Sequence, residues 1–276
     1  MSAAGTAGGP GRAAAGGGAG PRLQITGLGI SFGSRPVVAL DELSVGAAEI
    51  VGLAGESGSG KSMTTLAVLG LAHTVGASVT GSIRLDGQEL TVLSQSQLRE
   101  LRGRRIAAVF QNPAAAFSPV YRVGHVVRRA LRCHGASGSE ADDRAAAAMR
   151  SVLLPPDLLR RYPSQLSGGQ LQRVAIALAL ALQAEVLLAD EPTSALDVTV
   201  QAEVLELLRG LRESAGLSIL FISHDLAVVA ELCDRVAVMR DGAIVEQGPA
   251  ARLLSTPAAE YTAELLAAVP GLEAEA

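Results

Sequence analysis

The sequence is poor in cysteine, and the two cysteines that it has lie far apart, at Cys133 and Cys233. Neither matches the spacing of a metal-binding motif. Two cysteines also cannot supply the several bridges that stabilise small secreted domains. We therefore expect two ordinary thiols in a reducing compartment and no disulfide framework.

Long apolar runs are absent as well, although 49% of the residues are hydrophobic. The longest run, 174–182, falls well short of the roughly 20 residues that span a bilayer. Residues 1–21 contain no Leu, Ile, Val or Phe, so they lack the apolar core of a secretory signal. This predicts that no segment crosses a membrane and that the Gly- and Ala-rich residues 1–21 form a disordered tail.

Positive charge is not in excess, because the formal net charge is -4 and the isoelectric point is near 5.6. Such a chain has no overall attraction for nucleic acid or anionic lipid, and binding to either would need a local basic patch. The short segment 102–105, RGRR, is the one evident basic cluster. We expect no nucleic-acid partner.

What the sequence does contain is a series of short apolar runs rich in β-branched residues, with helical patterns between most of them. These runs are 49–55, 105–110, 185–190, 218–223 and 235–239. Continuous apolar runs of this length are typical of buried strands in a largely parallel sheet. The pattern predicts an α/β fold.

Two Asp-Gly pairs, Asp86-Gly87 and Asp241-Gly242, are typical of tight hairpin turns and predict additional antiparallel strands. Between residues 112 and 172 the pattern changes to Ala, Arg and Leu at helical spacing, which predicts a helical subdomain. We expect the whole domain to cover 22–270, with a short tail at 271–276.

The segment 49–62 reads as a strand, a glycine-rich loop and a helix, with Gly55, four residues, Gly60, Lys61 and Ser62 at P-loop spacing. Glycines let successive N–H groups converge on phosphates, Lys61 can reach the β and γ oxygens, and the Ser62 hydroxyl can coordinate Mg²⁺. We expect a nucleotide to contact Gly55, Glu56, Ser57, Gly58, Ser59, Gly60, Lys61, Ser62 and Met63.

Polar residues also follow three other predicted strands. Because ligands of α/β sheets bind beyond the carboxyl ends of the strands, these residues point to catalysis. Asp190 can hold Mg²⁺, and Glu191 can orient and deprotonate water. His224 can hydrogen-bond the γ-phosphate or the attacking water. Gln111 can reach the metal or the water as an uncharged ligand.

The segment 166–170, LSGGQ, places two glycines directly before a long apolar helix. Without side chains, Gly168 and Gly169 leave the backbone N–H groups of the helix start uncovered, as an anion site requires.

Together these motifs resemble those of the ATP-binding subunit of ABC transporters, in order and spacing, over nearly everything from 22 to 270. The resemblance makes 55–62 the Walker A loop, Gln111 the Q-loop, 186–192 the Walker B motif, 194–197 the D-loop and His224 the switch histidine. It implies an ATPase of P-loop type that uses ATP and Mg²⁺.

In that family two ATPases pack head to tail, so the signature 166–170 of one subunit would complete the site of the other. The resemblance implies that Ser167, Gly168, Gly169 and Gln170 meet the γ-phosphate held by the partner. Phe32 matches the aromatic residue that stacks on adenine, and packing within its strand is the alternative role.

The segments 55–64, 190–208 and 223–248 look like those of the importers of oligopeptides, dipeptides and nickel. This resemblance implies two membrane permeases, a solute-binding protein, a second and different ATPase subunit, and a place on the cytoplasmic face of the membrane. An accessory ATPase of a phosphonate-cleaving complex is the alternative. The C-terminal segment 261–270 also resembles that group, but Ala259 and Glu260 stand where His-Pro is usual.

The segment 112–125 follows Gln111 directly and is where we expect the subunit to grip its permease. Its apolar and aromatic residues are of the kind that anchors protein interfaces. They are Phe117, Pro119, Val120 and Tyr121. Packing inside the helical subdomain is the alternative for this cluster.

Overall fold

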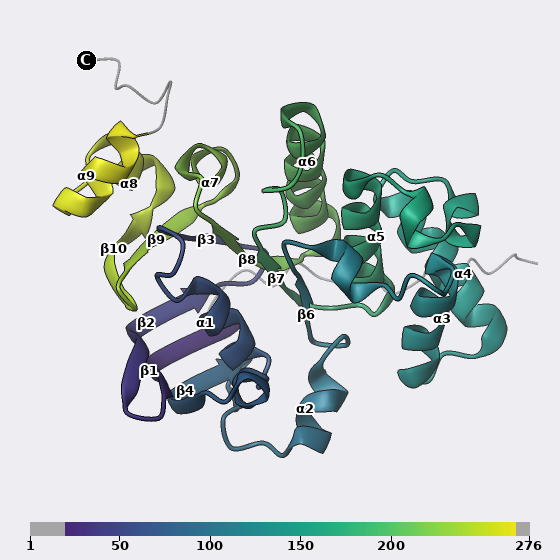
Figure 1. The fold of residues 1–276 in the computed structure, drawn as a ribbon, viewed down its shortest axis with the longest axis horizontal. Coiled ribbons are helices and arrows are strands. Elements are labelled where there is room, and N and C mark those ends of the chain that lie inside the picture. Colours follow the sequence, from purple (N-terminus) through teal and green to yellow (C-terminus); the bar gives the residue numbers. More distant parts are fainter. Residues whose placement is uncertain (1–19, 269–276) are drawn as a thin grey trace, which may run out of the picture.

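The main sheet joins segments that are far apart in the sequence, between residues 50 and 249. The structure is a computed structural model that describes residues 20–268, so most of the predicted tail 1–21 and the predicted tail 271–276 lie outside it. Six strands run in the order β10-β9-β3-β8-β7-β6 (Figure 1). Their bounds are β3 Ile50–Ala54, β6 Ile106–Val109, β7 Val186–Asp190, β8 Ser218–Ser223, β9 Arg235–Arg240 and β10 Ala243–Pro249.

All neighbouring pairs in this sheet are parallel except β9 and β10. The central strands β3, β8 and β7 are buried along their whole length because both faces of the sheet are covered. In β7, for example, Leu187 and Ala189 face one hydrophobic cluster, while Val186 and Leu188 face the other. Each predicted apolar run contains a strand of the sheet, so the predicted α/β fold is confirmed.

A second sheet is antiparallel and has the order β2-β1-β4-β5. Its strands are β1 Leu23–Phe32, β2 Arg35–Val45, β4 Ser78–Leu85 and β5 Gln88–Glu89. Both Asp-Gly pairs form hairpin turns with positive φ, 46° and 79° at Asp86 and Gly87 and 48° and 87° at Asp241 and Gly242. Positive φ at both central residues defines the turn type that suits a tight hairpin, so both hairpin predictions are confirmed.

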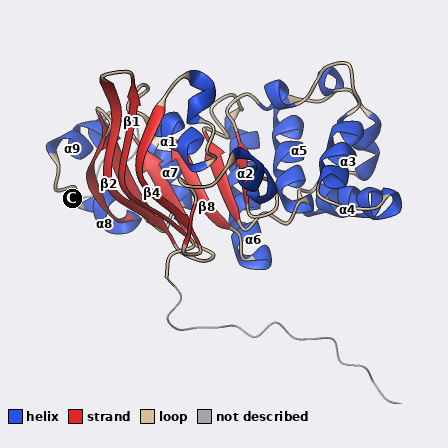
Figure 2. Ribbon diagram, turned by 90° about the horizontal axis from the view of Figure 1, so that it is seen from below, coloured by secondary structure: helices blue, strands red, loops and turns tan. Residues whose placement is uncertain are grey.

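Helices cover the main sheet and extend beyond it. They are α1 Lys61–Val68, α2 Gln95–Leu101, α3 Val123–Cys133, α4 Gly138–Ser151, α5 Gly168–Ala181, α6 Val198–Ala215, α7 Leu226–Leu232, α8 Ala250–Ser255 and α9 Glu260–Ala267. Helices α3 and α4 lie at the end of the molecule opposite the antiparallel sheet (Figures 1 and 2). Across residues 20–268 no helix combines the length and apolar character needed to span a bilayer, and both cysteines are free thiols.

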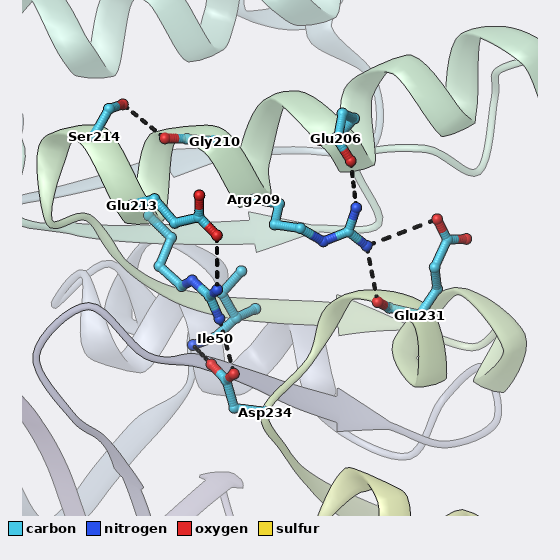
Figure 3. A network of polar contacts seen from close by, with 9 residues as sticks. Ile50, Glu206, Arg209, Gly210, Glu213, Ser214, Glu231 and Asp234 are labelled. Carbon is cyan, nitrogen blue, oxygen red and sulfur yellow. Dashed lines mark hydrogen bonds and ion pairs between the residues drawn. The ribbon is translucent and has the colours of Figure 1, made fainter.

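A polar network fixes α6 against α7 and the start of β3 (Figure 3). Arg209 donates to the Glu231 carbonyl oxygen at 3.0 Å, and Arg212 donates to the Asp234 carboxylate at 2.8 Å. The other Asp234 oxygen accepts the Ile50 N–H at 2.8 Å. The network therefore holds α6 and the α7–β9 connection against the amino end of β3.

Candidate functional site

The predicted polar residues gather at one edge of the main sheet, because parallel strands end at the same edge. The glycine-rich loop follows β3, Gln111 lies two residues beyond β6, Asp190 ends β7 and His224 follows β8. A cavity of about 450 Å³ lies at this edge. Its lining residues are Val37, Ser57, Gly58, Gly60, Lys61, Ser62, Met63, Gln111 and Glu191. The structure thus brings the loop together with Gln111 and Glu191, as predicted, and adds Val37, which no sequence motif indicated.

The loop between β3 and α1 can be built only with glycine at two positions. Gly55 has φ of 146°, and a Cβ atom there would lie 2.1 Å from the Met239 carbonyl oxygen. Gly60 has φ of 107°, and its Cβ would lie 2.7 Å from the side chain of Val38. The sequence indicated glycine at these positions because it leaves the backbone N–H groups uncovered. The close approach of β9 and β2 to the loop is a second reason for glycine, which sequence reasoning missed.

Lys61 is the first residue of α1, directly after this loop, and is only 5% exposed. Its Nζ donates to the carbonyl oxygens of Gly55 at 2.6 Å and Glu56 at 2.7 Å. Burial lowers the pKa of Lys61, while the charges of Glu191, Asp190 and Glu56 act to raise it. The ammonium group therefore lies beside the loop and close to Asp190 and Glu191 at the end of β7.

Ser62 and Asp190 form the pair that the sequence predicts as metal ligands. The Ser62 hydroxyl donates to the Asp190 Oδ1 at 3.1 Å, and Asp190 is 5% exposed. Burial raises the pKa of Asp190 and the charge of Glu191 adds to this, whereas the Ser62 hydrogen bond and the Lys61 charge oppose it. A buried carboxylate beside a hydroxyl fits a hard divalent cation such as Mg²⁺, which prefers oxygen ligands.

Glu191 and His224 contact each other, which the sequence did not predict. The Nδ1 atom of His224 lies 3.1 Å from the Glu191 Oε1. Glu191 has φ of 48°, a strained value for a residue with a side chain, and its N–H donates to the Ile222 carbonyl oxygen at 2.9 Å. The bond to β8 holds this conformation, which places the carboxylate within reach of the histidine.

Phe32 ends β1 and is 39% exposed. It is not among the residues that line the cavity, whereas Val37 of the neighbouring strand is. Stacking of Phe32 on adenine therefore stays a prediction.

The signature segment lies apart from this cavity and forms the start of α5. Ser167 caps the helix by accepting the Gln170 N–H at 3.2 Å, and the Gln170 side chain accepts the Ser167 N–H at 3.1 Å. The two glycines differ from each other. A Cβ at Gly168 would meet nothing closer than 3.7 Å, but one at Gly169 would lie 2.3 Å from the side chain of Val200. Gly169 is thus also required for the packing of α5 on α6.

The expected interface cluster in 112–125 is divided by the structure. Phe117 is 2% exposed and belongs to the hydrophobic core, so its prediction as a surface anchor is wrong. Val120 and Tyr121 are 71% and 45% exposed, and the Tyr121 ring stacks on that of His125 with centroids 4.7 Å apart. Phe117 directly follows the short 3₁₀ helix Pro113–Ala116, which the composition of the segment did not indicate.

Comparison with known sequences gives close matches. The sequence pattern described as ABC transporter matches residues 40–194. A putative peptide import ATP-binding protein of Brucella abortus is 44% identical over 261 residues, which cover 92% of this chain and 78% of that protein. The dipeptide transport ATP-binding protein DppD of Escherichia coli is 40% identical over 255 residues, covering 90% of this chain and 78% of DppD.

The fold also matches solved structures that are described as an ABC transporter component and an ATP-binding cassette. The protein cbiO1 from Clostridium perfringens, part of the ABC transporter complex cbiONQ, matches with a TM-score of 0.75 and 26% identity, over 86% of this chain and 91% of that one. A dimeric ATP-binding cassette in a post-hydrolysis state, bound to ADP and Pi, matches with a TM-score of 0.71 and 28% identity. That match covers 83% of this chain and 98% of the cassette.

Proposed function

This chain belongs to the ABC transporter family, and we propose that it is the ATP-hydrolysing subunit of an importer for peptides. One observation carries the proposal: the P-loop, the Ser62–Asp190 pair and the Glu191–His224 pair lie at one edge of the sheet. The inference that peptides are the substrate rests on the names of the two relatives reported above.

In this proposal the loop N–H groups of 57–62 bind the phosphates of ATP, and the dipole of α1 adds a favourable interaction. Lys61 exchanges its loop carbonyl partners for the β and γ oxygens. Mg²⁺, when bound, would neutralise phosphate charge, and Ser62, Asp190 and Gln111 would hold it.

Glu191 acts as the general base on the attacking water. Its contact with His224 fixes the direction of the carboxylate, so that one oxygen stays available to accept a proton from water. His224, half exposed, can turn its other ring nitrogen toward the γ-phosphate.

The exposed start of α5 completes the site of a second subunit. Ser167, Gly168 and Gln170 are exposed or partly exposed in this chain, although they belong to the signature. We infer a head-to-tail pair in which these residues contact the γ-phosphate held by the partner. The partner is a second, different ATPase, and the pair lies on the cytoplasmic face of the membrane against two permeases that receive peptide from a solute-binding protein.

The proposal is tested by peptide uptake in a strain from which the gene is deleted. Wild-type chain should restore uptake of short peptides, while Lys61→Ala, which removes the charge facing the phosphates, should not. Expression of both proteins at equal levels is the control. Uptake that is unaffected by the deletion, or restored equally by Lys61→Ala, would contradict the proposed function.

A further inference from the structure

The C-terminal helix α9 reaches the phosphate-binding loop. The backbone N–H of Glu56 donates a hydrogen bond of 3.4 Å to the Tyr261 hydroxyl, across 205 residues of sequence. Tyr261 is 7% exposed, so its ring is packed in the protein and its hydroxyl faces the loop. A residue outside every nucleotide motif thus touches the first turn of the loop.

The peptide group that Tyr261 holds is also held by Lys61. The N–H of Glu56 and the carbonyl of Gly55 belong to one peptide, which is planar. Lys61 donates to that carbonyl oxygen at 2.6 Å. The plane is therefore fixed at both ends, by an ammonium group on one side and a phenol on the other. Gly55 restrains its own backbone little, so these outside bonds set the orientation of the peptide.

Tyr261 is itself held by the β9–β10 hairpin. The Arg240 guanidinium lies over its ring, 4.5 Å from the centroid. Glu246 of β10 accepts the N–H groups of Ala258 at 2.8 Å and Ala259 at 3.0 Å, which secures the start of α9. In the same hairpin, the Gly242 N–H donates to the Ser59 carbonyl oxygen of the loop at 3.0 Å. The C-terminal part of the domain thus supports the phosphate-binding loop at two points.

We propose that Tyr261 is a positioning residue for ATP binding: its hydroxyl holds the Gly55–Glu56 peptide in place when Lys61 turns to the phosphates. This rests on the proposed function. Once Lys61 leaves the Gly55 carbonyl oxygen, the hydrogen bond from the Glu56 N–H to the Tyr261 hydroxyl is the one that still holds this peptide, among the residues that the structure describes. Without it the peptide can rotate, and the N–H groups that follow lose their alignment.

The test is Tyr261→Phe in the full chain, which removes the hydroxyl and keeps the ring under Arg240. We expect the dissociation constant for ATP with Mg²⁺, measured by calorimetry, to rise about 2- to 10-fold, the range for one neutral hydrogen bond. Tyr121→Phe is the matched control, because no described residue bonds that hydroxyl, and it should bind ATP like wild type. The melting temperature without nucleotide should stay the same for both variants.

Other results would overturn the proposal. Unchanged ATP affinity in Tyr261→Phe, with wild type binding ATP normally, would reject the positioning role and leave the proposed function intact. A lower melting temperature with unchanged affinity would make Tyr261 merely structural. Failure of the wild-type chain itself to bind ATP would instead reject the proposed function on which this inference rests.

Discussion

At the level of single residues, Glu191 combines a left-handed backbone with a contact between its carboxylate and a histidine. Its backbone is in the left-handed region, with φ of 48°, and its carboxylate lies 3.1 Å from the His224 Nδ1. Strained residues held in this way occur most often at functional sites. Both features support its role as the base.

Glu191→Gln should keep ATP binding and slow hydrolysis by about 10²- to 10⁴-fold, the usual contribution of a positioned general base. The amide has the same shape and can still accept from His224, but it cannot take a proton from water. Steady-state release of phosphate and ATP affinity are to be measured on the same protein. Hydrolysis at the wild-type rate would remove Glu191 from the mechanism.

Glu89 predicts a pH dependence of stability. Burial raises the pKa of Glu89, but hydrogen bonds from Ser82, Thr91 and the Ile83 N–H outweigh it and lower the value from 4.5 to about 2. A carboxylate whose folded pKa is depressed stabilises the protein above its unfolded pKa, and this contribution is lost as the pH falls through the folded pKa.

Glu89→Gln should therefore lower the free energy of unfolding by about 1 to 2 kcal/mol at pH 7, after allowance for solvent screening. The difference from wild type should shrink between pH 4.5 and about 2. Urea unfolding across this range measures it, with Glu42→Gln on the exposed side of β2 as the control. A difference that stays constant with pH would contradict the assignment.

At the level of elements, the start of α5 has two tasks, because it presents the signature and packs on α6. The packing depends on Gly169, whose hypothetical Cβ lies 2.3 Å from Val200. Val200 is β-branched and cannot easily rotate away, so α6 itself would have to shift.

Gly169→Ala should destabilise the chain by about 1 to 3 kcal/mol, the usual cost of overpacking. Gly168→Ala is the matched control, since its nearest neighbour would be 3.7 Å away and alanine favours a helix. Urea unfolding of the two variants should separate them clearly. Equal stability would show that α5 and α6 adjust without cost.

The segment after Gln111 also divides into a core part and a surface part. Phe117→Ala should lower the free energy of unfolding by about 3 to 5 kcal/mol, because it leaves a cavity in the core. Tyr121→Ala should cost less than about 0.5 kcal/mol, as is usual at exposed positions.

If Tyr121 grips a permease, its variant should bind ATP normally and lose permease in co-purification. If the Tyr121→Ala variant retains the permease, Tyr121 is not a permease contact.

At the level of the whole molecule, the cavity of one chain is not lined by its own signature residues 166–170. The proposed catalytic unit is therefore a pair. We expect the isolated chain to bind ATP at any protein concentration but to hydrolyse little of it. The rate per chain should rise when the second ATPase is added. Full activity that is independent of both concentration and partner would show that one chain suffices.

The sequence by itself determined five strands of the main sheet, both hairpins and the P-loop, because each depends on short stretches whose residue types act locally: continuous apolar runs, Asp-Gly pairs, and glycines before Lys61 and Ser62. The order of polar residues after strands also sufficed to predict that they meet, since parallel strands end at one edge.

Only the tertiary structure decided which residues touch across long stretches of chain. Phe117 was expected on the surface and lies in the core, because neighbours distant in sequence close over it. The Gly169–Val200 contact and the bond from Glu56 to Tyr261 likewise join separate elements. No local pattern encodes such contacts, because they depend on how helices and strands pack in three dimensions, and burial then selects the side chains that fit.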